Sequence, residues 1–170
     1  MSNTTQWFER KFGFSFSADL YPNLCIRLRG TPARIEELLR DRPHHLLIRR
    51  NKEKWSAQEQ LGHLLDLEPL WSARVDDFIQ SKKDLSPADL QNRKTHEANH
   101  NARNSSDLLR DFRSARTALA EKLATLRPEQ FAQALIHPRL KQPMRLVDHL
   151  YFVAEHDDHH LAKIWSDLRS

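Results

Sequence analysis

The sequence predicts an all-α protein, an antiparallel four-helix bundle, and two observations support this prediction. Apolar residues recur at spacings of three and four through four long stretches, which is the period of helices with one buried face. The chain of 170 residues holds only three glycines, which argues against a sheet-rich fold with many turns. Long amphipathic helices bury their apolar faces by packing together as a bundle.

The length predicts one domain over residues 21–170, because a chain of this size can bury a sizeable core. Residues 1–20 are rich in aromatic residues and have no clear period. We expect an arm laid against the bundle and anchored by its rings, with a partner or dimer contact as the alternative role. The rings are those of Trp7, Phe8, Phe12, Phe14 and Phe16.

The first helical pattern extends over residues 24–39 and is interrupted at Gly30. Thr31 is suited to an N-cap and Pro32 to the first helical position after it. The segment is therefore either one kinked helix or a short helix followed by a longer one. Pro43 ends the pattern.

The second helix has a clear start, because Ser56 and Glu59 have the spacing of a capping box. Its apolar face, over residues 61–78, contains His63. Glu59 lies one turn before His63 and Asp66 about one turn after it, so either carboxylate can accept the proton on the second ring nitrogen. A hydrogen-bonded core histidine without a metal is the alternative interpretation of His63.

Residues 82–104 form a polar connection in which His96, Glu97 and His100 have the spacing of the zinc-protease motif HExxH. Residues 92–104 contain no aliphatic residue larger than alanine, so they cannot form the buried helix that such a site requires. We therefore do not expect a protease. Either the segment is an exposed loop, or it folds over a metal site and offers His96, Glu97 or His100 to substrate.

The third helix is predicted to begin near Ser105 and to continue to Leu126 with apolar residues at regular spacing. We find no polar residue suited to chemistry on its buried face and expect a purely structural role. A connection over residues 128–142 follows, and Pro143 fits the first turn of the last helix.

The last helix contains the strongest candidates for chemistry. His156 and His160 lie within its apolar face, one turn apart, with Cβ atoms roughly 5–6 Å from each other. Two imidazoles held in this way can share a metal ion, and histidines packed in a core are the alternative. Together with His63 they form a three-histidine set on facing helices.

Three further residues of this helix bear on the site. Asp157 lies near the centre of the apolar face, where a carboxylate needs a partner such as a metal-bound imidazole or an arginine. His149 is about 10.5 Å along the axis from His156, too far to bind the same ion, and we expect it to line the approach. His159 points away from this face, and we expect it in solvent.

Two segments resemble the DinB-like superfamily: Lys54-Trp55-Ser56 through Gly62-His63-Leu64, and Ala154-Glu155-His156-Asp157-Asp158-His159-His160. The resemblance covers about residues 20–168. It implies a four-helix bundle, often dimeric, that binds a divalent metal through one histidine on the second helix and a His-xxx-His pair on the fourth. The matching positions are His63, His156 and His160. Residues 1–20 and 95–100 are not general features of that superfamily and can mark a subgroup with its own substrate.

The resemblance also implies a range of reactions, because the superfamily includes thiol-dependent transferases, an isomerase that uses a low-molecular-weight thiol, and hydrolases without a known substrate. Three neutral imidazoles suit Zn²⁺ or Ni²⁺ first, and also Fe²⁺ or Co²⁺, and they leave one coordination position open. An ion held there lowers the pKa of a bound water towards about 7, or converts a bound thiol to its reactive thiolate.

We therefore expect a metal-dependent hydrolase or low-molecular-weight-thiol transferase that acts on a small molecule. Glu59, Asp66 or Asp157 would orient the metal ligands, and Glu97 and Glu155 are candidates for a general base. The alternative is a non-catalytic, dimeric binding or stress-response module with a structural or vestigial metal site. An open site facing a cleft favours the enzyme, and a sealed site favours the module.

Charge and composition limit the partners and the location. The chain has 27 basic and 23 acidic residues, interspersed, which argues against the one-sided basic surface of a nucleic-acid-binding protein. No apolar run approaches the ~20 residues of a membrane span, and we find no signal peptide. With a single cysteine, Cys25, the chain has no internal disulfide, so we expect a cytoplasmic protein and, from its long amphipathic helices, a homodimer.

Overall fold

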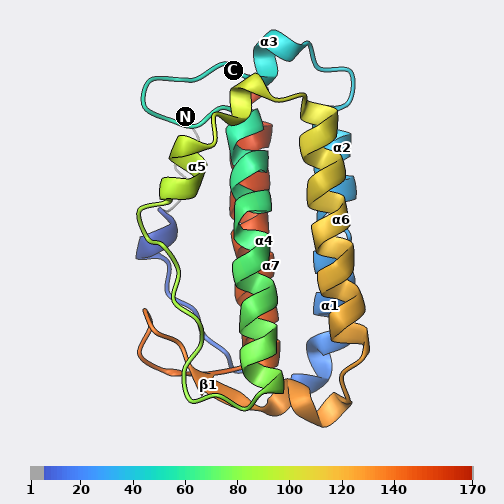
Figure 1. Ribbon diagram of the computed structural model, residues 1–170, viewed down its shortest axis with the longest axis vertical. Helices are drawn as coiled ribbons and strands as arrows, with labels where there is room; N and C mark the ends of the chain where they lie inside the picture. The colour runs from blue at the N-terminus through green and yellow to red at the C-terminus, as the bar shows by residue number, and fades with distance from the viewer. Residues whose placement is uncertain (1–5, 170) are drawn as a thin grey trace.

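The computed structural model describes residues 6–169 and is a bundle of four helical columns (Figure 1). The columns are α1 (Tyr21–Arg29) continued by α2 (Thr31–Leu39), then α4 (Ala57–Ile79), α6 (Ser105–Ala124) and α7 (Leu146–Asp167). α4 packs against α6 and α7, and α1 packs against the same two helices. The colours of Figure 1 show that α4 and α6 run in one direction and α1, α2 and α7 in the other. The predicted fold class is confirmed.

Gly30 joins α1 to α2 in the first column without leaving helical geometry. Gly30 has φ −78° and ψ −12°, and its N–H donates to the Ile26 carbonyl at 3.0 Å. Of the two arrangements expected from the sequence, the structure is nearer to two successive helices, although α1 and α2 have the same length of nine residues. The prediction that Thr31 caps a new helix is wrong, because Thr31 is the first residue of α2 and its hydroxyl donates to Asp157 on α7 at 2.8 Å.

The starts of α4 and α6 follow from local sequence. The capping box at α4 is confirmed: the Ser56 hydroxyl accepts from the Glu59 N–H at 3.2 Å, and the Glu59 carboxylate accepts from the Ser56 N–H at 2.9 Å. α6 begins at Ser105, as predicted, with the Asn104 side chain accepting from the Ser106 N–H at 2.8 Å. Each of these caps satisfies backbone donors that the first turn of a helix leaves free.

A short hairpin precedes the last helix and was not predicted. After the 3-10 turn Pro128–Ala132, strand β1 (Ala134–Ile136) pairs antiparallel with β2 (Pro143–Arg145), and Leu135 lies opposite Met144. Pro143 therefore begins a strand, and the prediction that it lies in the first turn of the last helix is wrong. Strands of three residues are too short to show an alternating pattern, and their pairing buries Leu135 and Met144 against the bundle.

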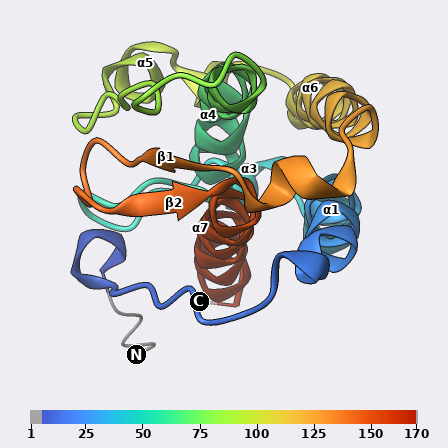
Figure 2. The ribbon, with the colours of Figure 1, turned by 90° about the horizontal axis from the view of Figure 1, so that it is seen from below.

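The remaining short helices lie in the connections. They are the 3-10 turns Trp7–Glu9, Ala18–Leu20 and His100–Ala102, and the helices α3 (His44–Leu47) and α5 (Arg93–Glu97). Figure 2 shows the N-terminal segment, α5 and the hairpin gathered on one side of the α4–α7 pair, with α1 and α6 on the other side. The bundle is thus covered on one side by segments that belong to no helical column.

The N-terminal segment contacts the bundle through its aromatic rings. Trp7, Phe12, Phe14 and Phe16 pack against the core, whereas Phe8 is 56% exposed. The Trp7 ring lies 5.1 Å from that of Phe152 on α7. Residues 1–5 of the predicted arm, and Ser170 of the predicted domain, lie outside the described residues.

One ion cluster lies inside the bundle, and the sequence analysis missed its central residue. Arg116 on α6 is 1% exposed and pairs with Glu68 at 2.6 Å and with Asp157 at 2.5 Å. Arg116 lies on the buried face of α6, where we expected no polar residue suited to chemistry, and its ion pairs join helices of the bundle. Of the two partners expected for Asp157, the arginine is the one present. In the described part of the chain, no helix has the length and apolar character needed to cross a membrane.

Candidate metal centre

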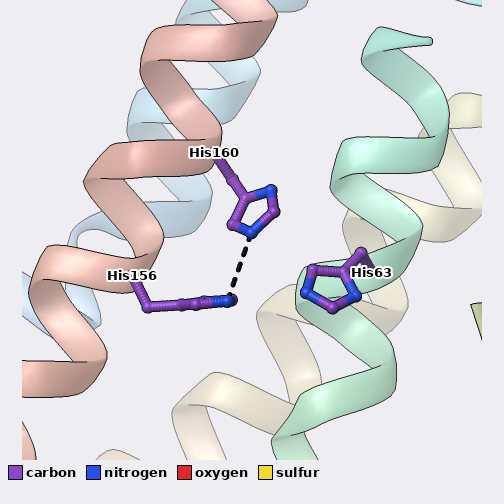
Figure 3. A group of neighbouring side chains, drawn as sticks. All are labelled: His63, His156 and His160. Carbon is purple, nitrogen blue, oxygen red and sulfur yellow. Dashed lines mark hydrogen bonds between the residues drawn. The ribbon is translucent and has the colours of Figure 1, made fainter. Parts of the chain in front are cut away.

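Three histidine rings from two helices converge at one point (Figure 3). His63 comes from the first half of α4, His156 from the middle of α7 and His160 from its second half. Because α4 and α7 run in opposite directions and pack together, these halves lie side by side. One ring nitrogen of each histidine lies within 4.8 Å of the others, and each residue is at most 4% exposed. The structure thus brings together the three residues chosen from the sequence.

Hydrogen bonds fix the orientation of two of these rings. The Nδ1 atom of His160 lies 2.6 Å from the Gln60 amide oxygen, which can only accept, so Nδ1 bears the proton. The Nδ1 atom of His63 lies 3.1 Å from the Thr95 hydroxyl, which itself donates to Asp66 at 3.0 Å. The hydroxyl oxygen therefore accepts from His63. In both rings the Nε2 atom is left with a free lone pair, the form in which histidine binds a metal.

The third ring shows that the group fits a cation. The Nε2 atoms of His156 and His160 lie 3.2 Å apart, and the proton of His160 is on its other nitrogen. Either a proton on His156 Nε2 or a cation must lie between them, because two lone pairs at this distance repel. The Nδ1 atom of His156 is buried and has no hydrogen-bond partner among the described residues. Among the described residues, the two ring nitrogens of His156 therefore do not both have a hydrogen-bond partner.

The three imidazoles are neutral at neutral pH. Burial lowers the pKa of His63 to about 4, with Lys163 and His100 adding to the effect and Asp66 opposing it. Burial also places the pKa values of His156 and His160 well below the ordinary value, with further lowering from the neighbouring histidines. A divalent metal competes with protons for these nitrogens, so a low pKa favours metal binding.

The carboxylates expected beside His63 have different roles. Glu59 completes the cap of α4 and pairs with Arg50, so it does not reach His63, contrary to one of the two expectations. Asp66 acts on His63 through the hydroxyl of Thr95. The sequence analysis missed Thr95, because one threonine in a polar connection gives no pattern that indicates a role.

The other two acidic candidates lie away from the three rings. Asp157 is held by Arg116 and Thr31 inside the bundle and does not contact the histidines. Glu155, a candidate for a general base, pairs with Arg27 at 2.7 Å and with Arg10. Arg27 and Arg10 lower the pKa of Glu155, although its partial burial acts in the opposite direction. No hydrogen bond joins either carboxylate to the three histidines within residues 6–169.

The segment with the HExxH spacing folds over α4, and its three candidates separate. His100 is buried and its Nε2 donates to the Asp66 carboxylate at 2.8 Å, so it supports the site and is not offered to substrate. Its ring lies directly on Gly62, where a Cβ atom would come within 2.2 Å of it. His96 is exposed, lies beside the Trp55 ring at 5.4 Å, and faces the pocket described below. Glu97 is exposed and does not line that pocket.

The histidines lie on the wall of a pocket of about 740 Å³. The pocket is lined by residues of α4 and α7 and by residues of the N-terminal segment, the connections before α4 and α5, and the hairpin loop. Aromatic rings form much of its wall; they belong to Trp7, Trp55, Trp71 and Phe152. An ion held by the three rings would therefore be accessible to a small molecule.

Two histidines of α7 are not where the sequence analysis placed them. His159 is 4% exposed and lines the pocket beside the Trp7 ring, at 5.7 Å, so the expectation that it lies in solvent is wrong. The N-terminal segment covers it, which helical spacing alone does not reveal. His149 is 1% exposed, packs between Trp71 and Phe78, and does not line the pocket, so the expectation that it lines the approach is also wrong.

Comparisons with known proteins agree with this architecture. The chain is similar in structure to YfiT from Bacillus subtilis, with a TM-score of 0.81 and 21% sequence identity over 95% of this chain and 93% of that chain. YfiT is described as "a probable metal-dependent hydrolase with an unusual four-helix bundle topology". At this identity the likeness shows the fold. No curated protein matches the sequence.

The sequence model of the DinB superfamily matches residues 27–164, which extend over most of the four helical columns and include the three histidines. The match covers most of the chain. This protein therefore belongs to the DinB superfamily.

Proposed function

We propose that this protein is a metal-dependent enzyme that acts on a small molecule, with one divalent transition-metal ion held by His63, His156 and His160. The observation that supports the proposal is the position of three neutral imidazoles on the wall of a pocket of about 740 Å³. Three protein ligands leave a coordination position free, and here that position has access to the pocket. A structural metal site would be closed, so the non-catalytic module is the less favoured alternative.

A zinc or nickel ion at this site supplies Lewis acidity and lowers the pKa of a bound water or thiol. The chain itself orients the rings, through Gln60 for His160 and through Thr95 for His63. Trp7, Trp71 and Phe152 contribute apolar ring surface to the pocket wall. Among residues 6–169, none of the five acidic candidates contacts the three rings directly, so the proposal assigns no carboxylate as the base that activates the nucleophile.

Two reactions fit this arrangement: hydrolysis, with water as the nucleophile, and transfer of a low-molecular-weight thiol. The description of YfiT as a metal-dependent hydrolase supports the first. The absence of a neighbouring carboxylate base is compatible with the second, because a thiol loses its proton more readily than water does. A screen of ester, amide and electrophilic substrates, run with and without small thiols, separates the two by whether turnover requires the thiol.

The experiment that tests the metal site is elemental analysis of protein purified without an affinity tag or chelator. We expect about one transition-metal ion per chain in the wild type and none in the double variant His63→Ala/His160→Ala. The matched control is His44→Ala/His45→Ala, which removes two exposed histidines on α3 and should retain the ion. Metal retained by the His63/His160 variant would place the site elsewhere. No metal in the wild type, even after reconstitution with zinc and nickel, would favour the non-catalytic module.

The proposal includes a cytoplasmic homodimer. Trp165 on α7 is 50% exposed and lies beside a shallow apolar groove formed with Leu38, Leu161 and Ala162. A second copy covering this surface would bury the ring. Sedimentation of the wild type at the mass of a dimer, and of Trp165→Glu at the mass of a monomer, is the expected result.

A further inference from the structure

A second polar group lines the same pocket, away from the three histidines. It consists of Arg74 on α4 and of His137 and Arg139 in the loop of the hairpin. Arg74 lies about three helical turns, roughly 16 Å along the axis, from His63. The two groups therefore occupy different parts of one elongated pocket.

Arg74 is a buried cation without a carboxylate partner. It is 2% exposed, its Nε donates to the Ser86 carbonyl at 2.9 Å, and no ion pair involves it within residues 6–169. Asp77, the nearest source of negative charge, is engaged by Lys82 at 2.7 Å and by the Ser86 N–H at 2.6 Å. Burial lowers the pKa of Arg74 to about 10. Burying a guanidinium without a partner of opposite charge costs free energy, and an anion bound beside it would reduce that cost.

Arg139 is in a similar condition. Its Nη2 is buried without a hydrogen-bond partner, and it forms no ion pair with any described residue. The guanidinium lies over the rings of Phe8, at 5.4 Å, and Phe152, at 5.9 Å. These aromatic faces position the guanidinium on the pocket wall, but they provide no acceptor for its N–H groups.

His137 adds a third donor. Its Nδ1 accepts from the backbone N–H groups of Arg139 and Leu140, both at 3.2 Å, so its proton is on Nε2. That Nε2–H lies 3.3 Å from the Nη1 of Arg74, and both atoms are then donors. Burial, together with the charges of Arg74 and Arg139, lowers the pKa of His137 to about 3, so the ring stays neutral. Two donors facing each other need a shared acceptor.

Trp71 connects this group to the histidines. Its ring lies 5.5 Å from the guanidinium carbon of Arg74 and 5.8 Å from the ring of His156, and its Nε1–H is buried without a partner. Asp89 also lines the pocket, but the N–H groups of Gln91 and Arg93 engage it, and it forms no ion pair with Arg74 or Arg139. Around Arg74, His137 and Arg139, donors thus exceed acceptors, and neither arginine has an ion-pair partner in the part of the chain that the structure describes.

We propose that Arg74, His137 and Arg139 bind an oxyanion, the carboxylate or phosphate group of the substrate, while another part of the same molecule reaches the three histidines. Guanidinium groups recognise such anions through paired N–H groups, and Trp71 and Phe152 provide an apolar wall for the body of the ligand. The substrate class is a small, elongated anion. The second half of this inference rests on the proposed metal-dependent function, whereas anion binding by the arginines does not require a metal.

The test is calorimetric titration of chelator-treated protein with inorganic phosphate and, separately, with acetate. We expect one of the two to bind with 1:1 stoichiometry, and the better probe distinguishes phosphate from carboxylate recognition. Arg139→Gln and Arg74→Gln should each weaken binding roughly tenfold or more, because each removes a charged donor. Arg110→Gln, an exposed arginine on α6, is the matched control and should bind as the wild type does. Arg74→Lys, which keeps the charge, replaces Arg74→Gln if circular dichroism shows that the latter does not fold.

The same titration in His63→Ala/His160→Ala separates this inference from the proposed function. Binding retained in that variant supports the arginine site. No binding of either probe to the wild type, or equal binding to the wild type and Arg139→Gln, overturns it. Binding only after zinc loading, and its loss in the histidine variant, overturns the arginine site and leaves the metal site intact. A wild type that binds the anion but holds no metal as purified, and takes up neither zinc nor nickel on reconstitution, overturns the proposed function alone.

Discussion

Two buried polar clusters lie against different faces of α7, and they differ in how completely their hydrogen-bonding groups are satisfied. In the ion cluster, every guanidinium nitrogen of Arg116 donates, to Glu68, to Asp157 or to the Leu28 carbonyl. In the histidine cluster, His156 has one nitrogen without a partner and the other facing the lone pair of His160. Both clusters are at most 4% exposed, so burial does not distinguish them.

The difference follows from what surrounds each cluster. Asp157 faces α6 and the first column, where Arg116 and Thr31 supply donors. His156, one residue earlier and about 100° away around the helix, faces the pocket. A saturated buried network stabilises the fold, whereas unsatisfied groups beside a pocket indicate a binding site. The same contrast separates Arg116 from Arg74, a second buried arginine that has no carboxylate partner.

The largest effect on stability is expected from removing the arginine at the centre of the ion cluster. Arg116→Ala leaves Glu68 and Asp157 buried without their cation, which should lower the free energy of unfolding by about 3–5 kcal/mol. Urea denaturation measures the change. Arg113→Ala on the same helix removes an exposed pair with Glu36 and should cost at most about 1 kcal/mol. Equal losses in the two variants would contradict the assignment of Arg116 as a structural residue.

The histidine cluster should make the metal-free protein sensitive to mild acid. Burial lowers the pKa of His63 to about 4, whereas the unfolded chain titrates near the ordinary value of about 6.5. Between these values the unfolded state binds more protons, so stability should fall as pH falls, by up to about 1.4 kcal/mol per pH unit for each such histidine. Urea midpoints at pH 7, 6 and 5 measure the slope. The slope should be smaller in His63→Asn, and an unchanged slope would show that His63 is not the residue responsible.

A smaller effect is expected from the hydroxyl between His63 and Asp66. Thr95→Val removes the acceptor for the Nδ1 proton of His63, so zinc affinity should fall by about 10–100-fold while the three ligands remain. Competition with a chromophoric chelator measures the affinity. Thr125→Val changes an exposed threonine at the end of α6 and is the control. Wild-type affinity in Thr95→Val would show that this hydroxyl does not orient the ring.

The smallest effect on metal binding is expected from substitution of Cys25, which lies in neither cluster. Burial raises the pKa of its thiol to about 11, so little thiolate is present at neutral pH. We expect an aromatic disulfide reagent at pH 8 to react much more slowly with the native protein than with the urea-unfolded chain. Cys25→Ser should retain the metal content of the wild type. Rapid reaction of the native protein would indicate a thiol available for chemistry.

The sequence by itself determined the features that depend on neighbouring residues. Helical period indicated the columns, the Ser56–Glu59 pair indicated the start of α4, and a spacing of four placed His156 and His160 on one face. Including His63 in the three-histidine set required only the assumption that the apolar faces of the second and the last helix pack together. The helix cap and the histidine spacing are local properties, and the helical period follows from burying one face of a helix. A single sequence contains both kinds of information.

Only the tertiary structure decided which distant groups meet. The pairing of Asp157 with Arg116, the contact of Thr95 with His63 and the covering of His159 by the N-terminal segment all join residues far apart in the chain. Such contacts depend on the register of helices and on the path of connections, which have no period to detect. The unpaired state of Arg74 is visible only when every neighbour is placed, because an arginine that lacks a partner and one that has several look the same in a sequence.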